Sequence, residues 1–149
     1  MSSLANNIKT GIVTQLQTLI TANKIASYIE EDLSKNVLDL DFPSFPCVVI
    51  GMPSVSSANY EYQAANRRVY QFDLLVVTKV DNLESATDIE ELMDAIMNQF
   101  DNKFTLGGAA DLGVEATTTP ATPVSSKGKT FIVFGVTIKA NVLAQLDYS

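Results

Sequence analysis

Two segments of the chain carry apolar residues at helical spacing. From Ser3 to Thr21, and again from Ser85 to Lys103, apolar side chains recur every three or four residues. This period places them on one face of an α-helix. Ser85 is suited to cap the second helix, and Asp88 in its first turn lies at the positive end of the helix dipole. We expect two amphipathic helices that cover a sheet with their apolar faces.

Four other segments have the pattern of β-strands. Ile25 to Ile29 predicts a short strand, and the continuous apolar run from Cys47 to Met52 predicts a strand that is covered on both faces. Alternation of apolar and polar residues predicts two longer strands, from Val69 to Val80 and from Thr130 to Leu143. In the Val69–Val80 strand, the first half should be open to solvent on one face and the second half should be covered.

The last of these strands is unusually long. The run from Thr130 to Leu143 would span about 45 Å at roughly 3.3 Å per residue, whereas strands usually contain about five or six residues. Lys139 and Asn141 lie on its polar face near the end. We expect this end to reach solvent or a neighbouring molecule, because exposed strand edges are natural pairing sites.

The remaining segments connect these elements. Val55 to Asn66 is polar and is predicted to be a loop. Leu112 to Val124 is rich in β-branched residues and has no helical period, so it is predicted to supply a further strand, the first of a final hairpin. Ser125 to Lys129 is predicted to be the turn of this hairpin. Residues 1–149 are therefore predicted to form a single α/β (α+β) domain. Its one mixed, mainly antiparallel sheet has two helices packed on one face and a long protruding C-terminal hairpin.

The composition argues against most kinds of catalysis. The chain of 149 residues contains no histidine and one cysteine, Cys47. Ser-His-Asp and Cys-His catalysis and the common zinc sites are thereby excluded, and no phosphate-binding glycine motif is present. The carboxylates between Glu30 and Asp41 leave a cation site open as an alternative, but their spacing fits no EF-hand. We predict that the protein is not an enzyme and holds no metal and no cofactor.

Charge and hydropathy bear on the partners and the compartment. The net charge is −7, and an acidic surface repels phosphate backbones, so specific binding of nucleic acid is not expected. No apolar run approaches the roughly 18 residues of a membrane span. The first residues also lack the basic start and apolar core of a signal peptide. We expect a protein that is made and used in a cytoplasm, with no membrane partner.

A stretch in the middle of the chain resembles a known family. Its residues are Glu61-Tyr62-Gln63-Ala64-Ala65-Asn66-Arg67-Arg68-Val69-Tyr70-Gln71-Phe72. An apolar, proline-led strand precedes it at Phe45–Ile50, and an acidic helix and a Thr-Leu-Gly-Gly turn at Thr105–Gly108 follow it. In this order, the segments resemble the tail terminator proteins of long-tailed (siphovirus-type) bacteriophages. The likeness extends from the first helix to the last strand.

The resemblance implies a homo-oligomeric ring, usually a hexamer, on top of the tail tube. Such a ring would stop polymerisation of the tail tube protein and offer a docking face to the head-completion (stopper) protein. DNA would pass through its lumen without specific binding, so we expect a net negative lumen with carboxylates from the second helix or from Glu30 to Asp41. The implied location is the head–tail junction of a virion, with the host cytoplasm during assembly. The alternatives are a head-closure or other neck protein, and a dimeric small-molecule-binding regulatory domain.

The only two arginines of the chain, Arg67 and Arg68, are candidates for the subunit interface. A guanidinium group suits bidentate pairing with a carboxylate. We expect both to pair with carboxylates of a neighbouring subunit, and the candidates are Glu90, Glu91 and Asp94. The alternative is a salt bridge to an acidic loop of the same subunit.

Two loops are candidates for binding the tail tube or the head-completion protein. The Val55–Asn66 segment contains Tyr60 and Tyr62, and the predicted hairpin turn contributes Lys127 and Lys129. Tyrosine is enriched at interfaces because it combines apolar area with a polar tip. We expect the tyrosine-bearing segment to be mobile in the free subunit and to become ordered on contact. The alternative is that both rings pack on their own sheet.

Overall fold

The computed structural model describes residues 4–30, 42–59, 65–79, 86–103, 105–110, 112–126 and 128–145. Its elements, in chain order, are α1 (Leu4–Thr21), β1 (Ser27–Glu30), β2 (Cys47–Ile50), β3 (Ser54–Asn59), β4 (Ala65–Lys79), α2 (Ala86–Asn102), the 3-10 helix η3 (Leu106–Gly108), β5 (Val114–Thr118), β6 (Thr122–Ser126) and β7 (Lys129–Gln145). Both predicted helices are present within one residue of their expected starts and ends.

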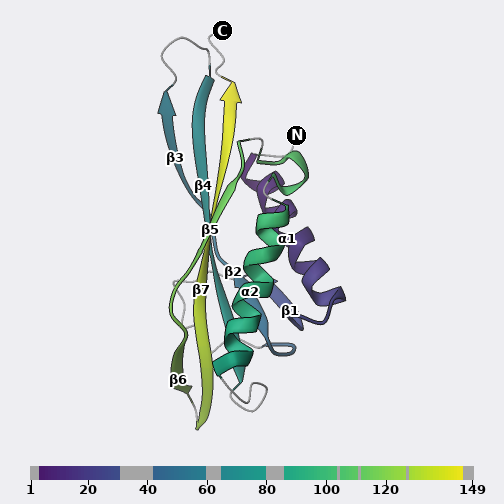
Figure 1. Cartoon of the computed structure of the whole chain (residues 1–149). Coiled ribbons are helices and arrows are strands. Elements are labelled where there is room, and N and C mark those ends of the chain that lie inside the picture. The colour runs from purple at the N-terminus through teal and green to yellow at the C-terminus, as the bar shows by residue number, and fades with distance from the viewer. Residues whose placement is uncertain are drawn as a thin grey trace.

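The strands form one seven-stranded sheet in the order β1-β2-β4-β7-β5, with β3 paired to β4 beyond the end of β2 and β6 paired to β7 beyond the end of β5. β1 pairs with β2 in parallel, and every other pairing is antiparallel. β4 and β7 form the spine, paired without interruption from Ala65↔Gln145 to Lys79↔Phe131. Both helices cover the same face of the sheet (Figure 1). The predicted fold class, a mixed and mainly antiparallel sheet with two helices on one face, is confirmed.

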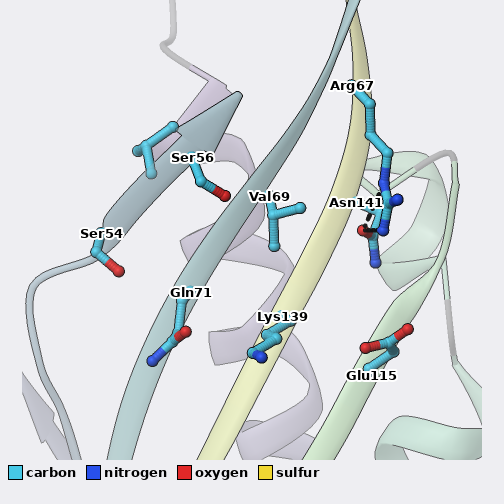
Figure 2. A pocket seen from close by; sticks show the side chains of 9 residues that line it. Ser54, Ser56, Arg67, Val69, Gln71, Glu115, Lys139 and Asn141 are labelled. Carbon is cyan, nitrogen blue, oxygen red and sulfur yellow. Dashed lines mark hydrogen bonds between the residues drawn. The ribbon is translucent and has the colours of Figure 1, made fainter. Parts of the chain in front are cut away.

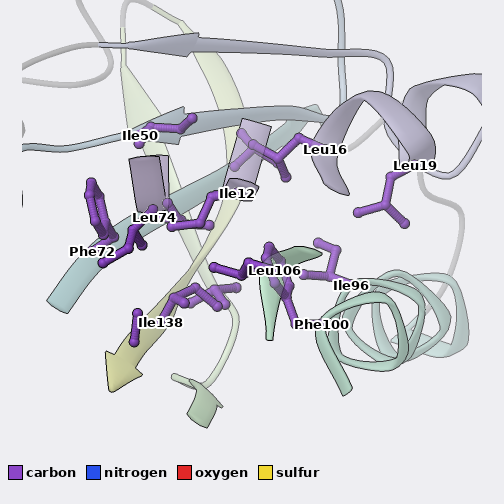
Figure 3. Close-up of a cluster of buried hydrophobic side chains, with 14 of the residues drawn as sticks. Ile12, Leu16, Leu19, Ile50, Phe72, Leu74, Ile96, Phe100, Leu106 and Ile138 are labelled. Carbon is purple, nitrogen blue, oxygen red and sulfur yellow. The ribbon is translucent and has the colours of Figure 1, made fainter. Parts of the chain in front are cut away.

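One core lies between the helices and this face of the sheet. Alternate residues of β4, from Tyr70 to Val76, are buried there against apolar residues of both helices (Figure 3). The helical residues are Ile8, Ile12, Leu16 and Leu19 of α1, and Leu92, Ile96 and Phe100 of α2. Each fully buried side chain of this size contributes roughly 1.5–3 kcal/mol of transfer free energy. The apolar residues predicted from the strand alternation and from the helical period therefore pack together in one hydrophobic core.

Two contacts fix the helices to each other and to the loop that follows α2. The side chain of Gln99 in α2 donates a hydrogen bond to Oε1 of the buried Gln15 in α1 at 2.6 Å. Gly11 faces η3 so closely that a Cβ there would lie 2.9 Å from Cβ of Leu106. Glycine at this position lets α1 approach the Thr-Leu-Gly-Gly segment, which forms η3 and not a simple turn.

On the opposite face, the sheet is covered over only part of its length. A second cluster contains Val49, Val77 and Phe131, with Phe42 and Phe45 packed against it. The ring of Phe45 lies 5.8 Å from that of Phe131. Farther along the same face, the side chains of β4 are mostly polar (Arg67, Gln71 and Asp73, with Val69 among them) and are exposed or only partly covered. The predicted change from an open to a covered half within this strand is therefore confirmed.

One predicted loop is a strand. Ser54–Asn59, expected to belong to a mobile polar loop, forms β3 and pairs with β4 from Ser54↔Gln71 to Asn59↔Asn66. The polar sequence misleads because the described side chains of β3, at Ser54, Val55 and Ser56, are exposed, and the strand is recognised by its pairing with β4. The pairing also places Arg67 and Arg68 inside β4, whereas we expected that strand to begin at Val69.

In the C-terminal half of the sheet, β7 pairs with two shorter strands, β5 and β6, that follow each other along the chain. β6 and β7 pair up to Ser126↔Lys129, and Gly128 in the turn has φ = 76°, a conformation that favours glycine. The predicted hairpin and its turn are confirmed. The chain segment before the hairpin turn is divided into two strands, β5 and β6. Between them, Oγ1 of Thr119 accepts a hydrogen bond from the amide of Gly135 at 2.7 Å.

Candidate interaction face on the open side of the sheet

The uncovered face of the sheet forms an open polar concavity of about 320 Å³. It lies on the side away from the helices, where β3, β4, β7 and β5 run side by side (Figure 2). Its lining residues are Ser54, Val55, Ser56, Arg67, Val69, Gln71, Glu115, Lys139 and Asn141. We call this surface the open face.

Arg67 is the best-defined cation of the open face. Its Nε and Nη2 donate hydrogen bonds to Oδ1 of Asn141 at 3.2 and 2.8 Å. Asn141 in turn donates from Nδ2 to the carbonyl oxygen of Gly113 at 3.1 Å. The guanidinium is thus held on a neutral amide, and no carboxylate of the described residues pairs with its remaining N–H donors.

Asn141 differs from what the sequence suggests. We expected it to reach solvent beside Lys139, but it is only 6% exposed. Its backbone also pairs with the loop before β5, since its N–H donates to Gly113 at 2.9 Å and its carbonyl accepts from Leu112 at 3.0 Å. The side chain can be buried because each end of its amide has a partner. Asn141 therefore positions Arg67.

Charged and polar side chains continue across the open face in register. Lys139 of β7 lies between Gln71 of β4 and Glu115 of β5. One row along, Oδ1 of Asp73 accepts hydrogen bonds from Gln71 at 3.2 Å and from Thr137 at 3.1 Å. Among the residues that the structure describes, neither Arg67 nor Lys139 has a carboxylate within 4.0 Å.

The two arginines of the sequence do not act from one surface. Adjacent residues of a strand point to opposite faces, so Arg67 belongs to the open face, while Arg68 lies on the face that carries Tyr70 and is only partly exposed. For Arg67, the described residues supply the amide of Asn141 as a partner, and the alternative of a salt bridge to an acidic loop stays untested because residues 31–41 lie outside the described part of the chain.

The predicted carboxylates lie on the other side of the molecule. Glu90, Glu91 and Asp94 are exposed on α2, which packs its opposite side against the sheet. They are therefore separated from Arg67 by the helix layer and the sheet. Whether they meet an arginine of a neighbouring subunit stays a prediction.

The remaining candidate residues lie in or beside the connections. Lys129 is exposed at the start of β7, opposite Ser126. Lys127, Tyr60 and Tyr62 lie outside the described residues, as does the acidic segment after Glu30. Glu30 itself forms an ion pair with Lys9 at 3.4 Å. The described part of the chain contains no cluster of potential metal ligands and no helix with the length and hydropathy of a membrane span.

Cys47 is buried in β2, as its apolar neighbours indicate. Burial raises the pKa of the Cys47 thiol, and a hydrogen bond with Ser27 offsets part of this shift. Since the thiolate is the reactive form, the site is built for packing and not for nucleophilic chemistry.

Comparisons with known proteins bear on the fold of the whole chain. No protein-family model and no curated protein matches the chain. A solved virion structure contains a chain with the same fold. It belongs to a structure described as the virion of a native gene transfer agent (GTA) particle, and the two chains share 13% sequence identity with a TM-score of 0.54. The alignment covers 97% of this chain and 100% of the other. At this identity, the likeness establishes the fold.

Sequence reasoning found Arg67 but missed the group that holds it. Asn141, Gly113 and the register that joins them depend on how β7 pairs with the loop before β5, and no local pattern specifies that pairing. The one available signal was the odd-numbered polar series Gln71 and Asp73 on β4, which continues back to Arg67 when the strand is extended by four residues.

Proposed function

We propose that this chain is a structural virion protein, and specifically a tail terminator that assembles into a ring, most simply a hexamer. The observation that carries the proposal is the likeness of the whole fold to a chain of a phage-like virion. The resemblance of the Glu61–Phe72 stretch to tail terminators of long-tailed phages supports the finer assignment. In this role, the ring stops growth of the tail tube and joins the tail to the head-completion protein.

The physical features of the chain fit an assembling protein. The sheet extends past the helices, so β3 and the ends of β4 and β7 form a thin layer that is not covered by a helix (Figure 1). The open face presents polar side chains and an oriented arginine. Such surfaces suit contacts with further protein. The absence of histidine supports a role without catalysis, and the net charge of −7 suits a channel wall past which DNA moves.

The test is assembly, measured with and without the tail tube protein of the same particle. Mass photometry across a range of concentrations should give a closed oligomer, and negative-stain electron microscopy should resolve rings that cap the ends of tubes. A terminal density without rotational symmetry would contradict the proposal. A dimer that binds metabolites would favour the regulatory alternative, and a ring that binds heads but leaves tube length unchanged would favour a head-closure protein.

A further inference from the structure

Arg67 is an exposed cation that Asn141 orients, and no carboxylate of the described residues lies within 4.0 Å of it. Asn141 takes up Nε and Nη2 through one amide oxygen, and the amide nitrogen of Asn141 is fixed on Gly113. Because Asn141 is buried, this support cannot turn away. A guanidinium held in this way loses little conformational entropy when it binds a carboxylate.

The outer side of α2 has the opposite character. Glu90, Glu91 and Asp94 are exposed there, and the helix sequence from Ala86 to Asn102 contains no lysine or arginine. Glu90 and Asp94 are four residues apart, a spacing at which like charges destabilise a helix. Repulsion between these carboxylates therefore destabilises the helix, and no cationic side chain of the helix offsets it. A cation from another molecule would reduce this repulsion.

These two surfaces lie on opposite sides of one subunit. The open face looks away from the helices, and the acidic side of α2 looks away from the sheet. Two different, complementary surfaces on one chain join copies head to tail, and such an interface closes into a ring when the rotation permits it. A two-fold dimer would instead require one surface that complements itself.

We propose that Arg67 anchors the interface between subunits, with the acidic side of α2 of a second copy as its occupant on the open face. The inference rests on the proposed function and names the contact that builds the ring. Lys139 lies on the same face and adds a second positive charge, while Glu115 beside it sets the register by repelling misplaced carboxylates.

A phosphate backbone is the competing occupant, since an arginine also binds phosphate bidentately. The charge of the whole chain disfavours it: the net charge is −7, and Glu115 and Asp73 stand on the same face as Arg67.

The test uses charge reversal and its compensation. Arg67→Glu should raise the concentration needed for assembly at least about thirtyfold, as expected when one partner of a close charge pair is lost. Lys24→Glu is the matched control, because it makes the same change of charge at an exposed position outside both the open face and α2. Combining Arg67→Glu with Glu90→Lys, Glu91→Lys and Asp94→Lys should restore assembly to within a few-fold of wild type. Folding of each variant is followed by circular dichroism.

The outcomes separate the contact from the function. Rings of Arg67→Glu at the wild-type concentration, or a combined variant that assembles no better than Arg67→Glu alone, would overturn the Arg67 contact and leave the ring intact. A wild-type protein that stays monomeric at all concentrations and on tail tubes would overturn the proposed function itself. Unchanged assembly with loss of binding to a duplex DNA oligonucleotide would assign Arg67 to phosphate and overturn this inference.

Discussion

Gly11 is the position at which α1 meets η3, and its lack of a side chain decides how closely they approach. A Cβ there would lie 2.9 Å from Cβ and 3.2 Å from the carbonyl oxygen of Leu106. In a free helix, Gly→Ala stabilises by about 1 kcal/mol, but overpacking costs roughly 1–3 kcal/mol. We therefore expect Gly11→Ala to lower the free energy of unfolding, measured by urea denaturation. As a control, Thr10→Ala at the exposed neighbouring position should leave stability unchanged or raise it. If Gly11→Ala is more stable than wild type, η3 must move away from α1 to make room for the new Cβ.

Thr78 carries a buried hydroxyl with no hydrogen-bond partner in the described part of the chain. An unsatisfied buried polar group costs about 1–3 kcal/mol. Thr78→Val keeps the shape and removes the hydroxyl, so we expect stability to rise by about 1 kcal/mol, seen as an increase in Tm. Thr137→Val is the matched control, since the hydroxyl of Thr137 donates to Asp73 and its loss should lower stability. A lower Tm for Thr78→Val would mean that the hydroxyl has a partner in solution.

At the scale of elements, β3 is where sequence and structure differ most. Its register on β4 runs from Ser54 to Asn59, and in an antiparallel pair every second residue of an edge strand directs its N–H to the partner. We expect hydrogen exchange measured residue by residue to show alternating protection along β3 in the isolated subunit. Uniformly fast exchange from Ser54 to Asn59 would mean that the strand forms only on assembly.

The elements that sequence predicted well are those whose pattern reflects burial. Both helices, the doubly covered β2 and the long β4 and β7 have periods set by what they bury, and these periods are local. β3 and the support of Arg67 depend instead on pairing between distant segments. Asn141 reads as a polar residue at an exposed end and is buried by a loop from Leu112 to Gly113. The alternation rule does separate Arg67 from Arg68, but only once both are known to lie inside the strand.

At the scale of the whole molecule, the subunit has two unlike sides. The helix side carries the exposed carboxylates of α2, and the open face carries Arg67 and Lys139 together with Glu115, Asp73 and neutral polar groups. A subunit with this distribution is suited to head-to-tail assembly, which leaves the remaining carboxylates to dominate the surface of the oligomer. The net charge of −7 per chain then multiplies with the number of subunits.

This charge predicts that the protein does not hold DNA. Binding of duplex DNA gains its free energy largely from counterions released by cationic side chains, and each chain has 10 basic against 17 acidic residues. We expect no binding of a fluorescent duplex at about 150 mM salt in anisotropy titrations, because screened repulsion still exceeds the attraction of isolated cations.

Glu90→Lys, Glu91→Lys and Asp94→Lys together change the net charge from −7 to −1 and should produce weak, steeply salt-dependent binding. Arg68→Glu is the control in the other direction and should change nothing. Wild-type binding at micromolar concentration in this salt would contradict this prediction, and with it the expectation of a net negative lumen.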